Sequence, residues 1–148
     1  YQRRVRGKMD YLENAILVDE QTRTQKILQN LKPLFNNEFI KLKLSPAKSI
    51  DSVQISFSAL GATIDCIVQF PPSYPLAAPK FFSLQVPVHP NIRATGEICY
   101  NLVQRDYRSD FTLESLILGL ICLLEEPNLD DYVNEEAAAI WRKKLDDL

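Results

Sequence analysis

Two runs of alternating apolar and polar residues, separated by a single glycine, place the strongest limit on how this chain folds. The runs are VQISFSAL (53–60) and ATIDCIVQF (62–70), and Gly61 is the only obvious turn residue between them. Alternation with a period of two is typical of strands with one buried face. The spacing predicts a β-hairpin, and therefore an antiparallel sheet. Shorter strand-like runs at 38–44 and 80–86 extend the predicted sheet to four strands.

Helical patterns flank the strands. Residues 10–32 carry apolar side chains near helical spacing until Pro33, which predicts an N-terminal helix; these side chains are Ile16, Leu17, Ile27, Leu28 and Leu31. Residues 113–126 are apolar nearly all round, between a possible cap at Thr112 and Pro127, which predicts a central buried helix. Asn134 is positioned to cap a last helix with glutamates early and lysines late. The order of elements predicts the α+β class.

Two connecting segments are unlike the regular elements. FPPSYPLAAP (70–79) is too rich in proline to be a central strand. Residues 87–111 are predicted to be mostly irregular, and a long loop in a compact domain is usually functional.

Composition excludes several classes of function. The chain has 148 residues, 46% of them hydrophobic, and a net charge of −2, which indicates one globular domain. This charge balance gives no case for nucleic acid or an anionic membrane as a partner. No apolar run approaches a membrane span, and the basic N-terminus lacks the apolar region of a secretory signal. The missing initiator methionine suggests a fragment.

Three cysteines are too few, and odd in number, for a disulfide framework. This favours a reducing compartment, so we expect the protein in the cytoplasm, the nucleus or both. No CxxC pair is present and His89 is the single histidine, so we expect no metal site. Cys66 and Cys122 are expected to be buried apolar fillers. Cys99 lies in the long loop and could be a filler, a metal ligand or a nucleophile.

The segments around Cys99 resemble those of the ubiquitin-conjugating enzymes. HPNIRATGEIC (89–99) is similar to the active-site segment of that family, with the cysteine eight residues after the asparagine. Further segments match in the same order, over roughly residues 22 to 140: RTQKIL, FPPSYPLAAPK, YNLVQRDY and EPNLDDYVNEEAA. The resemblance implies a UBC-like fold with an N-terminal helix, a four-stranded antiparallel meander and a long active-site loop. It divides the chain into an extension, 1–21, and a catalytic core, 22–148, with a shortened final helix.

The resemblance also implies a mechanism. An activating enzyme would use ATP to pass ubiquitin or a ubiquitin-like protein to Cys99 as a thioester, so the chain needs no cofactor of its own. A ligase of RING or cullin type would then help a substrate lysine attack this thioester. Asn91 would stabilise the oxyanion or hold the loop that does so; the alternative is an amide that only braces the loop. Asp131 would favour deprotonation of the lysine, or is simply a solvated acid. His89, Pro90 and Gly96 would be structural.

Several surface positions follow from the same resemblance. Leu118 matches a position that contacts the carried modifier, although it could also be a core residue. The positions expected to face a ligase or the activating enzyme are Tyr74, Pro75, Leu76 and Ser109. Residues 1–21 could dock the activating enzyme, or their basic side chains could be a solvated arm; these are Arg3, Arg4, Arg6 and Lys8.

The chain departs from the family pattern at the partner-facing loops. The usual turn between the two central strands is shortened to ALGAT, and Tyr107 stands where tryptophan is usual. Ala78, Leu129 and Tyr132 replace usual prolines, which puts loop rigidity and ligase preference in doubt.

Three functions remain open from the sequence. The first is a conjugating enzyme for ubiquitin or a ubiquitin-like protein. TGEIC, CYNLVQRD and VNEEAA look closer to the family branch that carries the cullin modifier (neddylation), so we lean slightly toward that modifier over ubiquitin. A non-catalytic variant of the fold that binds ubiquitin or a partner conjugating enzyme is the second hypothesis. A cysteine hydrolase is the third, and it depends entirely on His89 as the base.

Overall fold

The computed structural model of the protein describes residues 19–44, 50–85 and 88–148. The elements within these ranges are α2 (Glu20–Leu31), η1 (Lys32–Asn36), β1 (Ile40–Lys43), β2 (Ser52–Ala59), β3 (Ala62–Gln69), β4 (Lys80–Ser83), η2 (Asn101–Val103), α3 (Leu113–Glu125) and α4 (Glu135–Asp146). The α+β class is therefore confirmed. The predicted helix over 10–18 and the basic side chains of the extension lie outside the described residues, and α2 begins two residues before the predicted start of the core.

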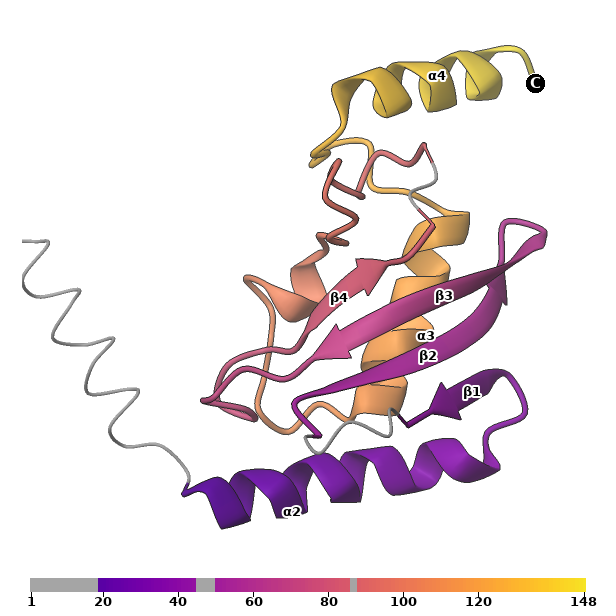
Figure 1. Cartoon of the computed structure of the whole chain (residues 1–148). Coiled ribbons are helices and arrows are strands. Elements are labelled where there is room, and N and C mark those ends of the chain that lie inside the picture. Colours follow the sequence, from indigo (N-terminus) through magenta and orange to yellow (C-terminus); the bar gives the residue numbers. More distant parts are fainter. Residues whose placement is uncertain (1–18, 45–49, 86–87) are drawn as a thin grey trace, which may run out of the picture.

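The four strands form one antiparallel meander in the order β1-β2-β3-β4, as the alternating runs predict. In the central pair Val53 faces Val68 and Ile55 faces Cys66, and these inward side chains are buried. The α3 helix crosses behind the sheet, while α2 lies at one end of the sheet and α4 at the other (Figure 1). The core therefore fills the space between the sheet, α2 and α3.

The turn between β2 and β3 uses two residues with positive φ. Gly61 has φ 71° and Leu60 has φ 56°. Two positive φ angles match the type I′ turn, whose twist suits a tight hairpin. The sequence identified Gly61, but nothing about a leucine predicts the left-handed backbone at Leu60.

The first helical region differs from its prediction in two details. Leu28 is 52% exposed, and the buried face instead carries Arg23, Ile27 and Leu31. Pro33 ends the α-helix but not the helical path, because the chain continues as the 3-10 helix η1. Proline fits there, at the start of a helix, where no backbone N–H is needed.

The strand predicted at 38–44 is shorter than expected. β1 spans only Ile40–Lys43, and Phe39 and Leu44 on either side of it are exposed. Ile40 supplies the buried contact in place of Phe39. The strand predicted at 80–86 is likewise observed as Lys80–Ser83.

The central helix α3 is buried on one face, not all round. Thr112 caps it as predicted, because its hydroxyl oxygen accepts a hydrogen bond from the N–H of Ser115 at 3.1 Å. Its outer face carries Leu118 and Cys122, which are exposed. Asn134 caps α4 in the same way, by accepting from the N–H of Ala137. No helix in the described ranges combines the length and apolarity needed to cross a membrane.

Candidate active site around Cys99

The loop between β4 and η2 folds back on itself to present Cys99. An isolated bridge pairs Ile92 with Ile98, and the N–H of Cys99 donates to the carbonyl of Asn91 at 2.8 Å. The N–H of Ile98 also donates to Phe81 in β4, at 2.9 Å. The cysteine is therefore fixed to the sheet through backbone hydrogen bonds, although it lies outside regular structure.

Gly96 makes the tight turn of this loop possible. Its φ is 92°, a conformation that side chains rarely adopt, and a Cβ there would lie 2.7 Å from the carbonyl oxygen of Ser83. The N–H of Ser83 donates to the Gly96 carbonyl at 2.8 Å, so the two backbones are already in contact. The geometry thus requires glycine at the position that the sequence marked as structural.

His89 is completely buried, and both ring nitrogens have partners. Nδ1 accepts from the N–H of Asn91 at 3.0 Å, and Nε2 lies 3.1 Å from the carbonyl of Leu124. Nε2 therefore carries the proton, and burial lowers the pKa of the ring. The ring also packs edge-on against Trp141 of α4. No ring nitrogen is left to serve as the base that a cysteine hydrolase would need.

Asn91 and Pro90 join the cysteine loop to the segment that precedes α4. The Asn91 side-chain amide donates to the carbonyls of Asn128 and Asp131, at 3.1 and 3.0 Å, and its oxygen accepts from the N–H of Asn128. The Pro90 carbonyl accepts from Val133 at 2.9 Å and from the next N–H along the chain. These contacts match the loop-holding role, since both amide hydrogens of Asn91 are already used.

Cys99 and Asp131 line the same cavity, of about 230 Å³. Cys99 is 5% exposed, whereas Asp131 is exposed. Burial raises the pKa of the Cys99 thiol; the hydrogen bond and charge of Arg93 lower this pKa, and the charges of Glu97 and Asp131 raise it. The Nε of Arg93 lies 3.2 Å from the Cys99 sulfur. Asp131, which the sequence predicts to meet the incoming amine, therefore borders the same space as Cys99.

The other two cysteines differ in burial. Cys66 in β3 is fully buried, as predicted, and burial raises the pKa of its thiol to about 12. The prediction for Cys122 is wrong, because its position on the outer face of α3 leaves it exposed. An apolar composition around the whole helix concealed which side faces the core.

The predicted partner-facing positions separate into buried and exposed residues. Tyr74 is 1% exposed, and its ring packs 4.8 Å from that of Phe70, so it supports the loop and cannot contact a partner directly. Leu76 and Ser109 are exposed. Leu118 is 43% exposed, which excludes the core alternative for it.

Tyr107 connects the two loops that carry Leu76 and Ser109. Its hydroxyl donates to the carbonyl of Pro75 at 2.6 Å. This hydrogen bond joins the loop that contains Leu76 to the segment that contains Ser109.

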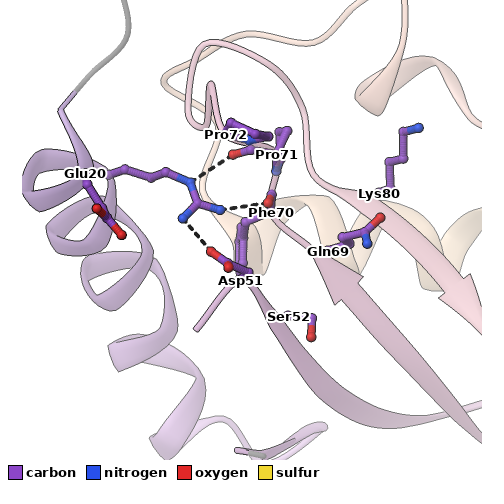
Figure 2. Close-up of a pocket in the computed structure, with 9 residues that line it drawn as sticks. Glu20, Asp51, Ser52, Gln69, Phe70, Pro71, Pro72 and Lys80 are labelled. Carbon is purple, nitrogen blue, oxygen red and sulfur yellow. Dashed lines mark hydrogen bonds and ion pairs between the residues drawn. The ribbon is translucent and has the colours of Figure 1, made fainter. Parts of the chain in front are cut away.

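Arg23 in α2 binds the backbone at the start of the proline-rich loop. Its Nε donates to the carbonyl of Pro71 at 2.9 Å, and its two terminal nitrogens bind Phe70 O at 2.8 Å and the Asp51 carboxylate at 2.6 Å (Figure 2). Arg23 and its three partners line an open cavity of about 780 Å³, whose lining also includes Lys80. Sequence reasoning missed Arg23 because a charged residue on an amphipathic helix usually faces water.

Comparison with known proteins shows the family of this chain. A family model described as ubiquitin-conjugating enzyme matches residues 60–147. Over 74 residues, half of this chain, the protein is 38% identical to ubiquitin-conjugating enzyme E2 S of Drosophila melanogaster and of Nematostella vectensis. These stretches cover 35% and 36% of those proteins, so the match spans about a third of their length.

The described part of the chain contains no group of three potential metal ligands.

Proposed function

Since the chain belongs to the ubiquitin-conjugating enzyme family, we propose that it carries ubiquitin or a ubiquitin-like modifier as a thioester on Cys99. The modifier is then transferred to the amine of a substrate lysine. The observation that carries this proposal is that Cys99 and Asp131 line one cavity, while both ring nitrogens of the single histidine, His89, have backbone partners.

The geometry favours attack by an amine over attack by water. Hydrolysis of a thioester needs a base that activates water, and His89 has no free nitrogen for that task. A lysine amine is itself a good nucleophile once it has lost its proton. In this proposal Asp131, which is exposed and lines the cavity, attracts the ammonium group and accepts that proton. The amine nitrogen bonds to the thioester carbon, the C–S bond breaks, and its electron pair returns to sulfur.

In this proposal Asn91 acts on Asp131 and not on the reacting carbonyl. Its amide binds the backbone at both ends of the 128–131 turn, so it sets where the carboxylate lies. Asn91 is therefore a positioning residue for Asp131.

Three partners follow from this role. An activating enzyme that consumes ATP would load Cys99, and a ligase of RING or cullin type would bind the loops with Leu76 and Ser109 at their surface. The carried modifier would contact Leu118 on the outer face of α3, where 43% of this side chain is exposed. Three unpaired cysteines fit a reducing compartment such as the cytoplasm or the nucleus.

The cargo is the finer part of the proposal. Segments such as TGEIC and VNEEAA resemble the branch that carries the cullin modifier. The matched relatives are named ubiquitin-conjugating enzymes, which favours ubiquitin. We therefore propose a test with both modifiers side by side.

The test is a charging assay with each modifier, its own activating enzyme and ATP. A thiol-sensitive adduct in the parent that becomes a thiol-resistant ester in Cys99→Ser would support the carrier role and identify the cargo. Cys122→Ser is the matched control, because Cys122 is an exposed cysteine outside the cavity. An unchanged adduct in Cys99→Ser would refute Cys99 as the carrier. No adduct with either modifier, on folded protein, would favour the non-catalytic binding module.

A further inference from the structure

The Cys99 sulfur has one positively charged neighbour, Arg93, among the residues that the structure describes. The Nε of Arg93 donates to Sγ at 3.2 Å, while the other polar contact of the sulfur is the Glu97 carbonyl at 4.0 Å. A guanidinium N–H directed at sulfur stabilises a thiolate more than a thiol, because the hydrogen bond becomes charge-assisted on both sides.

The backbone holds Arg93 in this position. Its N–H donates to the Glu97 carbonyl at 2.9 Å, and its own carbonyl accepts from Gly96 at 2.9 Å. The side chain therefore starts from the fixed base of the turn that Gly96 makes. Although Arg93 is exposed overall, its reach to the sulfur needs no rearrangement of the loop.

The remaining charges around the thiol are negative. Glu97 lies two residues before the cysteine, and Asp131 borders the same cavity from the segment before α4. Burial and both carboxylates disfavour the thiolate, and Arg93 is the group that opposes them. Without Arg93 the reacting atom would have no cationic partner in the described part of the chain.

We propose that Arg93 is a catalytic residue that stabilises the anionic sulfur of Cys99 in both halves of the transfer. The inference rests on the proposed carrier role. In loading, the Cys99 thiolate attacks the thioester of the activating enzyme, and the thiolate of that enzyme leaves. In discharge, the lysine nitrogen attacks, the C–S bond breaks, and the electron pair stays on Sγ beside the guanidinium, while the proton of the amine goes to Asp131 or to solvent. A stabilised thiolate is the better leaving group.

The test is the rate of alkylation of Cys99 by iodoacetamide as a function of pH, which requires no modifier. It is followed by mass spectrometry in a Cys122→Ser background, since Cys66 is buried and its thiol pKa is about 12. Arg93→Gln should move the midpoint of the rate curve to higher pH and lower the rate at pH 7 by about fivefold. This factor corresponds to about 1 kcal/mol, the value expected for one charge-assisted hydrogen bond at a partly exposed site. Glu97→Gln should move the midpoint to lower pH.

Two further variants separate contact from net charge. Arg93→Lys keeps the charge without the Nε–H donor and should fall between the parent and Arg93→Gln. Arg105→Gln removes the same charge from an exposed arginine outside the cavity, and should leave the curve unchanged. A curve for Arg93→Gln that coincides with the parent, or an equal shift in Arg105→Gln, would overturn the inference.

The outcome can be read separately from the carrier role. If the parent charges with a modifier while Arg93→Gln alkylates like the parent, the role of Arg93 is refuted and the carrier role stands. If no modifier charges but the alkylation curve shifts as expected, the thiolate contact stands and the carrier role fails. If both hold, single-turnover discharge to free lysine should slow about fivefold in Arg93→Gln.

Discussion

Replacing Gly96 with alanine would test whether the turn before Cys99 is as tight as the structure indicates. The added Cβ would lie 2.7 Å from the carbonyl oxygen of Ser83, and that oxygen belongs to a strand and cannot swing away like a side chain. The residue would also keep a φ of 92°. Two separate costs therefore apply to Gly96→Ala.

Their sizes can be estimated separately. A left-handed backbone costs a residue with a side chain about 1–2 kcal/mol. Forcing a methyl group into a filled space costs about 1–3 kcal/mol. We therefore expect Gly96→Ala to lower the free energy of unfolding by about 2–5 kcal/mol, measured by urea denaturation.

The hairpin glycine supplies a matched control. Gly61 has φ 71°, but a Cβ there would meet nothing within 4 Å. Gly61→Ala should therefore show only the backbone cost, about 1–2 kcal/mol. If the two variants lose the same stability, the close contact between Gly96 and Ser83 does not exist as described. Gly96→Ala should also slow alkylation of Cys99, whereas Gly61→Ala should not, because only the first turn holds the cysteine loop.

Four further predictions follow from individual contacts. His89 is the single histidine, and burial lowers its pKa in the folded protein. As the pH falls below about 6.5, the unfolded chain therefore binds this proton before the folded protein does, and the free energy of unfolding should decrease. This pH dependence should vanish in His89→Gln. Arg23→Ala should cost about 2–4 kcal/mol in urea unfolding, well above Arg142→Ala at the surface, and equal losses would contradict the buried contacts. Tyr107→Phe should lose about 0.5–1.5 kcal/mol in the same assay, and no loss would mean that its hydroxyl bond is not formed. Asp131→Asn should speed alkylation of Cys99 at pH 7, because the Asp131 charge raises the pKa of the thiol. The same change should slow lysine discharge about tenfold or more, because the proposed base is lost. If both rates change in one direction, the role of Asp131 as a base is contradicted.

The sheet was predictable because its signal is local and repeated. Alternation in 53–60 and 62–70 sets the inward face of each strand, and Gly61 sets the register of the pair. The caps at Thr112 and Asn134 were equally readable, since each depends on a side chain and an N–H three residues away.

Contacts made between distant segments were not predictable in this way. The burial of Arg23 depends on the carbonyls of Phe70 and Pro71, which lie more than forty residues further along the chain. The exposure of Cys122 depends on which face of an apolar helix meets the sheet, and hydrophobicity cannot distinguish two apolar faces. Tyr74 was predicted to face a partner for a different reason. Its whole segment was matched to a loop of the family, and such a match does not show that this ring turns inward.

The candidate active site combines local signals, which the sequence shows, with contacts between distant segments, which it does not. The spacing of His89, Asn91 and Cys99 marked the loop, but it did not show what each side chain does. In the structure the two residues with the chemistry of a base or an oxyanion donor, His89 and Asn91, direct their polar atoms at backbone groups. The charges left near the sulfur belong to Arg93 and the carboxylates of Glu97 and Asp131. A site built in this way has one cation beside the sulfur and a carboxylate that can attract an ammonium group, but no free histidine to activate water. Under the proposed carrier role, such an arrangement would favour a thioester that persists until an amine arrives.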